Sequence, residues 1–290
     1  MSKIAIITDS ASDVSPADEK EYGIFMMPFT AVLDDKEYVS RIDVDNDTFY
    51  KLMDASASLP THSQLTAYDF IQMYKKLFAD GYTDAIAVLI NAEGSSSFEN
   101  ACMAYDLFLE EVPQAKDVFH VHPFDSESYS GSYGYAVVEA AKMVRQEKPL
   151  EEILAFIRDW LDHVAIYFGI YTLKYAKKSG RIPSAAAFVG EALGLKPILY
   201  IDDHKIVTAD KVRGDKRVIP TIIDYVRKHM EPGSPYCLNY GSDRALLDEM
   251  RAAAEKAIGY PASYEFQVGA VIAANAGHRL IAITFRQKEQ

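Results

Sequence analysis

Short apolar runs alternate along the chain with longer segments in which apolar residues recur at helical spacing. Apolar runs bounded by polar turns predict strands, and the amphipathic segments between them predict helices. In the first half of the chain the predicted strands are residues 4–8, 25–32, 84–90 and 119–122. Strands that alternate with helices are typical of α/β proteins built on a parallel sheet.

The segment 171–201 predicts a helix, a stop, a second helix and a strand. The first helix ends in several lysines followed by a glycine, which is a favourable arrangement at a helix C-terminus. Pro183 prevents its continuation, and Ser184 is a suitable N-cap for the alanine-rich helix 185–193. That helix is too small and apolar for a surface helix, so we expect it to pack closely against another element. The strand 196–201 follows it.

The length of 290 residues fits two α/β domains better than a single core. We place the boundary near the end of the acidic amphipathic helix 150–164. The predicted N-terminal domain, residues 1–164, has a parallel, Rossmann-like sheet, and the C-terminal domain, residues 165–290, has a mixed sheet. Near the C-terminus, residues 269–277 are expected to form a loop between two strands.

The net charge of −12 argues against a nucleic-acid partner, because no long basic stretch offsets it. The N-terminal residues MSKIAIITDS contain one basic residue and a short apolar run. Such a segment is too short for a signal peptide or a membrane span. We therefore expect a cytoplasmic protein without membrane insertion.

The cysteines and histidines do not predict a metal site. Cys102 and Cys237 lie far apart without a C-x-x-C motif, so they are expected to be buried free thiols. His120 and His122 fall on one side of a predicted strand, with Asp125 nearby, but a third ligand is not placed. The acidic residues after residue 42 have the approximate spacing of a calcium loop but lack its glycine, so helix capping explains them better.

Polar loops follow two of the predicted strands, at Asp9 and Ser10 and at residues 94–97, and another polar loop, residues 61–64, leads into a predicted helix. In parallel sheets, ligands gather at the carboxyl ends of strands, and the free N–H groups at helix starts bind anions. The loop 94–97 lacks the lysine of a Walker motif, so a nucleotide phosphate is not expected. The same polar residues also serve as plain helix caps, and this alternative stays open.

Several motifs, in order along the chain, resemble those of the DegV family of bacterial fatty-acid-binding proteins. In the first half of the chain they are T-D-S-x-x-D at the N-terminus, the loops 62–64 and 94–101, and a D-S-x(n)-G helix entry at 125–134. In the second half, residues 173–199 contain a basic helix end with S-G-R-I, followed by L-K-P-I-L. The last motif is the segment 271–277. Each motif is weak alone, but together they cover nearly the whole chain.

The resemblance implies where a carboxylate would be held. His62 stands at a threonine position of the family, next to Ser63, and Asn275 stands where histidine is usual. Ser95 matches an inner serine of the family motif, and Ser96 replaces a glycine. The resulting ligand-binding candidates are His62, Ser63, Ser95, Ser96 and Asn275, with Thr61, Ser10 and Arg181 as secondary candidates; no catalytic residue is assigned.

The resemblance also implies a function. A long-chain fatty acid, such as palmitate or stearate, would lie between and within the two domains. The protein would be a carrier without a cofactor or enzymatic activity, and would present the acid to a dihydroxyacetone-kinase-like fatty-acid kinase. The kinase would make the acyl phosphate used in phospholipid synthesis. Lys211, Arg213, Lys216 and Arg217 match a basic element of the family that could hold an acidic partner or simply lie at a sheet edge.

Two other functions remain open from the residues alone. A hydrolase on the same scaffold would use Ser10 or Ser95, or a metal at His120 and His122. A carrier of another anionic metabolite is also possible, because Asn275 replaces the usual donor. The sequence contains no G-x-S-x-G, H-E-x-x-H or dinucleotide fingerprint, and the candidate residues are mostly neutral donors. This composition favours holding an anion over breaking a bond.

Overall fold

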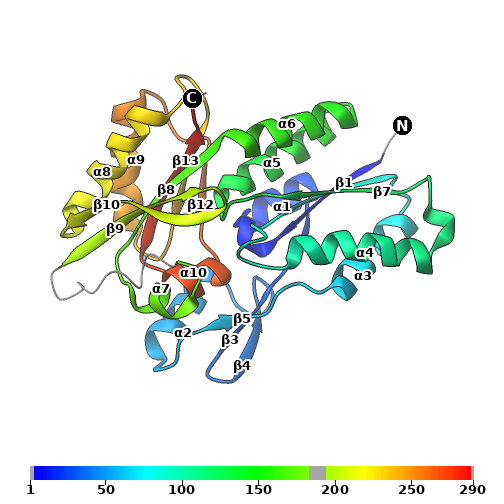
Figure 1. Cartoon of the computed structure of the whole chain (residues 1–290), viewed down its shortest axis with the longest axis horizontal. Helices are drawn as coiled ribbons and strands as arrows, with labels where there is room; N and C mark the ends of the chain where they lie inside the picture. Colours follow the sequence, from blue (N-terminus) through cyan, green and yellow to red (C-terminus); the bar gives the residue numbers. More distant parts are fainter. Residues whose placement is uncertain (1–2, 183–193, 289–290) are drawn as a thin grey trace.

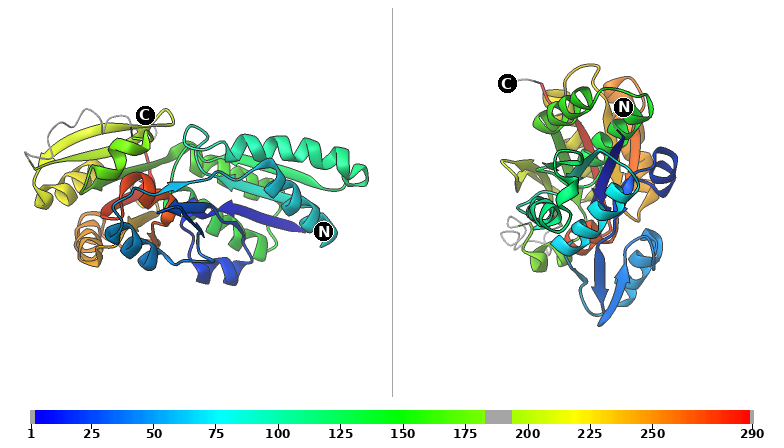
Figure 2. Two further views of the ribbon diagram at one scale, coloured as in Figure 1. Left: turned by 90° about the horizontal axis from the view of Figure 1, so that it is seen from below. Right: turned by 90° about the vertical axis from the view of Figure 1, so that its right-hand side faces the viewer.

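The computed structural model describes residues 3–182 and 194–288 of the chain (Figure 1). The predicted alanine-rich helix 185–193 and its cap Ser184 lie outside the described residues. The molecule is elongated, with one sheet toward each end (Figure 2).

The part of the chain before residue 164 alternates strands and helices as predicted. Its elements are β1 (Ile4–Asp9), η1 (Ser10–Ser12), α1 (Pro16–Tyr22), β2 (Phe25–Met27), β3 (Thr30–Leu33), β4 (Lys36–Val39), α2 (Asn46–Ala55), β5 (Thr61–His62), α3 (Ala67–Ala79), β6 (Asp84–Leu89), α4 (Ser97–Glu111), η2 (Pro113–Ala115), β7 (His120–Asp125), α5 (Gly131–Arg145) and α6 (Leu150–His163).

The remaining part of the chain contains more antiparallel pairing. Its elements are β8 (Val164–Ile170), α7 (Lys174–Ser179), β9 (Leu195–Asp202), β10 (Lys205–Arg213), η5 (Asp215–Arg217), α8 (Val218–His229), β11 (Tyr236–Tyr240), α9 (Arg244–Ile258), β12 (Tyr264–Gln267), α10 (Ala270–Ala276) and β13 (Leu280–Arg286).

The first sheet is parallel throughout and has the strand order β2-β1-β6-β7. Helices α3 and α4 pack side by side next to β6 and β7, and α5 packs on β1 together with α1 and α6 (Figure 1). The strand β6 is buried along its whole length, as expected for a sheet covered on both faces. The predicted parallel α/β sheet is confirmed.

The second sheet is mixed and has the strand order β10-β9-β8-β13-β11-β12. Among its strand pairs in residues 164–182 and 194–288, only β11 and β12 are parallel. Helices α8 and α9 form one apolar cluster with one face of this sheet. The opposite face packs against α7 and α10 and also against residues from β3, α2 and the turn before it. The predicted mixed sheet is therefore confirmed.

The apolar segment 25–32 does not form one strand. Pro28 separates β2, which joins the parallel sheet, from β3, which joins a small antiparallel sheet of order β4-β3-β5. Proline has no N–H group to donate to a strand ladder, so it ends the first pairing. Ala31 and Leu33 of β3 then pack in the same cluster as Ile166 and Phe168 of β8. The N-terminal half thus covers part of the second sheet.

The predicted loop 269–277 is wrong, because α10 occupies residues Ala270–Ala276. Its sequence AVIAANA contains no helix breaker and is rich in alanine, the residue with the highest helix propensity. Gly277, with a φ of 83°, follows as the cap. Asn275 therefore lies in the last turn of a helix.

The structure also locates the thiols and the histidines. Cys237 is buried, but Cys102 is only half-buried. His122 Nε2 lies 3.1 Å from Asp84 Oδ1. Within residues 3–182 and 194–288, no three metal-binding side chains cluster. No helix in those ranges is long and apolar enough to span a bilayer.

Candidate functional site

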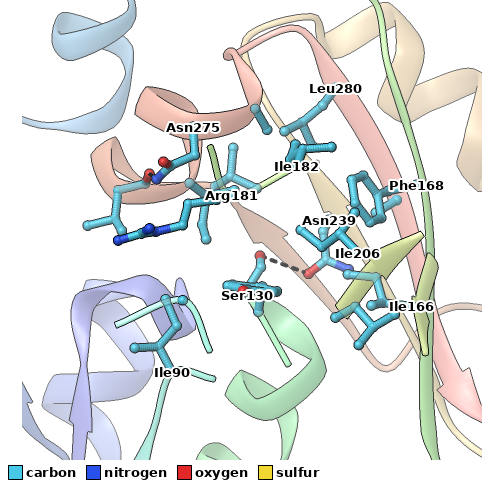
Figure 3. A pocket seen from close by; sticks show the side chains of 18 of the residues that line it. Ile90, Ser130, Ile166, Phe168, Arg181, Ile182, Ile206, Asn239, Asn275 and Leu280 are labelled. Atoms are coloured by element: carbon cyan, nitrogen blue, oxygen red, sulfur yellow. Dashed lines mark hydrogen bonds between the residues drawn. The ribbon is translucent and has the colours of Figure 1, made fainter. Parts of the chain in front are cut away.

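An apolar cavity lies between the second sheet and the ends of the first (Figure 3). The empty space between its walls, counting the part open to solvent, is about 690 Å³. The lining comes from both sides of the predicted domain boundary and consists of His62, Ile90, Gly94, Tyr129, Ser130, Ile166, Phe168, Arg181, Ile182, Ile201, Ile206, Asn239, Val268, Val271, Ile272, Asn275, Ala276, Leu280 and Ala282.

The second sheet forms the apolar wall of this cavity. Ile166 and Phe168 alternate along β8, and Leu280 and Ala282 alternate along β13, so each pair faces the same side of the sheet. At the edge, Ile206 of β10 pairs directly with Ile201 of β9. Such alternation also occurs in an ordinary core, which explains why the sequence could not distinguish the two.

A polar groove adjoins one end of the cavity and shares His62, Arg181 and Asn275 with it. We call these three residues the mouth. The rest of the groove is lined by Leu59, Pro60, Thr61, Tyr175, Lys178, Ser179 and Ala274. The mouth joins residues from β5, from the turn after α7 and from α10.

His62 and Asn275 form a hydrogen-bonded pair across the mouth. Asn275 Nδ2 lies 3.0 Å from His62 Nε2 and 2.8 Å from the carbonyl oxygen of Val271. Because the amide nitrogen donates to both, His62 Nε2 accepts, and the ring proton lies on Nδ1. The Nδ1 atom faces the carbonyl oxygen of Ser63 at 3.4 Å. The pair fixes both side chains beside the cavity.

His62 is neutral at pH 7. Burial lowers the pKa of its imidazole below the usual value, and the nearby positive charge of Arg181 lowers the pKa further. An imidazole in this state supplies a dipole rather than a charge. The positive charge of the mouth therefore resides on Arg181.

Arg181 brings a guanidinium group into an otherwise uncharged cavity lining (Figure 3). The residue is exposed, and among the described residues no carboxylate forms an ion pair with it. A guanidinium group binds a carboxylate with two parallel hydrogen bonds. Arg181 is therefore the residue of the mouth best suited to an anionic head group.

The serines ranked from the sequence lie beside the cavity. Ser95 is 7% exposed, and its Oγ lies 2.9 Å from Ser97 Oγ. Among the described residues that line the cavity is Gly94, which precedes Ser95 in the chain, but not Ser95 itself. Ser96 is exposed at the N-terminus of α4 and makes no side-chain capping bond.

The remaining candidates lie at other places. Ser63 is exposed, and its N–H donates to the carbonyl oxygen of Thr30 at 2.9 Å. Thr61 lines the polar groove. Ser10 is buried, and its Oγ accepts a hydrogen bond from the N–H of Phe29 at 3.0 Å. It borders a separate polar cavity on the side of α1 and α2.

A buried polar network lies in the cavity wall, and its members were not singled out from the sequence. Ser130 Oγ donates to Asp13 Oδ2 at 2.6 Å, and Asp13 Oδ1 accepts from the N–H of Gly269 at 2.7 Å. Asn239 Oδ1 accepts from the N–H of Gly131 at 2.8 Å. Two motifs indicated this region, the T-D-S-x-x-D motif, which contains Asp13, and the helix entry at 125–134, which contains Ser130.

Two aspartates of this region are buried, Asp9 and Asp13. Burial raises the pKa of Asp13 to about 8, although hydrogen bonds from Ser130 and Gly269 oppose the shift. Burial likewise raises the pKa of Asp9 to about 6, against hydrogen bonds from Ile90, Tyr133 and Ala11. Asp13 links η1 to the start of α10, the helix that carries Asn275.

The fold places the protein in a class of two-part α/β proteins known from solved structures. A stearic acid-binding protein of Eubacterium ventriosum superposes with a TM-score of 0.87 at 20% identity, covering 99% of this chain and 98% of the other. DegV of Bacillus subtilis, described as a fatty acid binding protein, superposes with a TM-score of 0.83 at 26% identity, covering 99% and 100%.

Sequence comparison defines the family. A sequence model of the DegV family matches residues 3–288. A DegV domain-containing protein of Staphylococcus aureus is 31% identical over 95% of this chain and 94% of its own. The chain belongs to the DegV family, and the resemblance inferred from its motifs is confirmed.

Proposed function

We propose that this protein binds one long-chain fatty acid, with the carboxylate at the mouth and the tail in the apolar cavity. The observation that carries the proposal is the cavity itself, whose wall is apolar and whose mouth holds Arg181 beside the His62–Asn275 pair. The fatty acids named for structures of the same fold support it.

The chemistry of the two ends matches an amphipathic anion. Removing an acyl chain from water contributes about 0.8 kcal/mol for each buried CH₂ group. The isoleucines of the wall and Phe168 provide the apolar surface for this. At the mouth, Arg181 offers the positive charge, while the two N–H groups of Asn275 already donate to His62 and to the carbonyl oxygen of Val271. A small hydrophilic anion would gain nothing from the wall.

The decisive experiment is the identification of a bound acid in protein purified without detergent. Native mass spectrometry should show a mass increase of one long-chain fatty acid, and solvent extraction should release that acid at about one molecule per chain. Protein stripped of lipid should bind added palmitate or stearate. A shorter hydrophilic anion in the extract, or no binding of added acid, would contradict the proposal.

We further propose that the protein presents the bound carboxylate to a dihydroxyacetone-kinase-like enzyme in the cytoplasm, where the acyl phosphate for phospholipid synthesis is made. The family resemblance supports this role, as does the basic segment formed by Lys211, Arg213, Lys216 and Arg217, which are all exposed. In a chain with a net charge of −12, such a segment suits an acidic partner surface.

Charge reversal tests the partner. With the purified kinase and ATP, the double substitution Arg213→Glu and Arg217→Glu should lower the rate of acyl-phosphate formation at least tenfold at low ionic strength, because opposite charges accelerate association. Fatty-acid affinity should stay unchanged. Lys228→Glu, at the exposed end of α8, is the matched control. Equal rates for all three proteins would argue against this surface, and the absence of product with wild type would argue against the partner.

A further inference from the structure

Ser130 has an unusual backbone conformation at a turn between a strand and a helix. It lies between β7 and α5, directly before Gly131, with φ of 59° and ψ of −144°. This region of conformational space is almost reserved for glycine, and residues held there cluster at functional sites. A strained strand-to-helix turn is also the local structure that presents a nucleophilic serine in many hydrolases.

The hydroxyl of Ser130 is paired with a carboxylate. Ser130 is 3% exposed and lines the cavity, and its Oγ lies 2.6 Å from Asp13 Oδ2. The other carboxylate oxygen of Asp13 accepts the N–H of Gly269 at 2.7 Å, which orients the group. A nucleophile, a base within hydrogen-bond distance and a third group that orients the base form the recurring pattern of covalent catalysis.

The serines considered from the sequence lack this arrangement. The Ser10 hydroxyl accepts from the Phe29 amide, and the Ser95 hydroxyl pairs with Ser97. Ser10 borders a different cavity. Ser130 combines the cavity position, the turn geometry and a basic partner.

We propose that Ser130 accepts acyl groups from long-chain oxygen esters or thioesters bound in the cavity, with Asp13 as its general base. This inference rests on the proposed function, because it requires the cavity to hold a long acyl chain. It adds a hydrolytic activity whose product is the fatty acid that the cavity is proposed to bind.

The reaction proceeds in two balanced steps. Asp13 takes the proton of the Ser130 hydroxyl while Oγ forms a bond to the acyl carbonyl carbon. The bond to the leaving oxygen or sulfur then breaks, and Asp13 returns the proton to it, giving the alcohol or thiol and an ester on Ser130. Water attacks this ester by the same route, so that fatty acid is released and Ser130 regains its proton.

Arg181 faces the same cavity as Ser130, from the side of α10 (Figure 3). In the tetrahedral intermediate the carbonyl oxygen carries a negative charge, which a guanidinium group stabilises. The opening at the mouth, next to the polar groove, offers the leaving group a route to solvent.

The rate should depend on the ionisation of Asp13. The charged and titratable groups around it are Asp9, which raises its pKa, Arg41, which lowers it, and the phenols of Tyr50 and Tyr133. Because only the carboxylate form accepts a proton, acyl transfer to Ser130 should increase as the pH rises through about 8.

The test uses delipidated full-length protein and a long-chain alkyl fluorophosphonate, which traps nucleophilic serines. Intact mass should increase by one adduct per chain at pH 9, and peptide mapping should place the adduct on Ser130. Ser130→Gly, which suits the positive φ at this position, should abolish the adduct in protein that keeps the circular-dichroism spectrum of wild type. Asp13→Asn should slow labelling about 100-fold or more, whereas Ser234→Ala, on a loop before β11, should label like wild type.

The outcomes separate this inference from the proposed function. Palmitate binding without an adduct, or an adduct on another residue, overturns the role of Ser130 and leaves the carrier role intact. A rate of labelling that does not change between pH 6 and pH 9 overturns the role of Asp13. Hydrolysis of p-nitrophenyl palmitate that is lost in both variants, in samples that still bind palmitate, supports the inference. Failure of wild type to bind palmitate refutes the proposed function itself.

Discussion

Arg181→Gln is expected to weaken palmitate binding by about tenfold to hundredfold. Hydrogen bonds to a charged partner contribute about 1.5–3 kcal/mol each, and every 1.4 kcal/mol corresponds to about a tenfold change in affinity. In the described lining no other side chain carries a full positive charge, since His62 is neutral at pH 7. Displacement of a fluorescent fatty acid from delipidated protein measures the effect.

Lys178→Gln provides the matched control for Arg181. Lys178 is an exposed cation in the polar groove but does not line the apolar cavity. Exposed charges contribute little to binding when they are not held in place. We therefore expect Lys178→Gln to lower palmitate affinity by less than about threefold. Equal losses for the two substitutions would indicate that only the overall charge of the region matters. The carboxylate would then not bind specifically at Arg181.

Asp13→Asn is expected to remove a large part of the pH dependence of stability. Burial raises the pKa of Asp13 from 3.8 to about 8, and each pKa unit corresponds to about 1.4 kcal/mol. The folded protein therefore prefers the protonated carboxyl. The stabilisation of wild type by this proton is complete below pH 3.8 and is lost as the pH rises toward about 8. The free energy of unfolding of wild type should therefore fall by several kcal/mol between these two pH values.

An asparagine can preserve the hydrogen bonds of this site. Its oxygen would accept the N–H of Gly269, its amide nitrogen would donate to Ser130 Oγ, and the Ser130 hydroxyl would turn to Asn239 Oδ1, which already lies 3.2 Å away. The free energy of unfolding should then be similar for both proteins at pH 5, and higher for the variant at pH 9.

Urea unfolding of delipidated protein at several pH values measures this difference. Asp9 is present in both proteins, but its charge raises the pKa of Asp13 in wild type, so the coupling of the two carboxyls contributes to the difference. Asp224→Asn is the control, because the Asp224 side chain is 73% exposed and forms only a surface pair with Arg227. A constant difference between wild type and Asp13→Asn across the pH range would mean that Asp13 remains ionised in the folded protein.

The fold was largely predictable because its elements follow local rules. The buried run of β6 and the amphipathic helices were evident from hydrophobic spacing. Residues 25–32 and 269–277 were not, for different reasons. The first segment changes sheets at Pro28, which depends on distant partners. The second is a short helix whose flanking glycines, Gly269 and Gly277, indicated a loop.

The candidate site was only partly predictable. The motifs identified His62, Asn275 and Arg181, which the structure brings together at the mouth. They could not reveal that Asp13 and Ser130, which are 117 positions apart, share a hydrogen bond. Nor could the apolar pattern of β8 or β13 distinguish a cavity wall from a core. These contacts form only when distant parts of the chain pack together, so the local sequence pattern does not predict them.

The packing of the early segment on the second sheet constrains the order in which this chain can fold during synthesis. Tyr50 donates to the carbonyl oxygen of Val268, and the side-chain amide of Asn46 donates to the carbonyl oxygen of Gln267 at 3.2 Å. The residues that accept these hydrogen bonds are synthesised more than 200 residues after the residues that donate them. Domains generally fold as they emerge, but here α2 must wait for nearly the entire polypeptide before its buried face is covered.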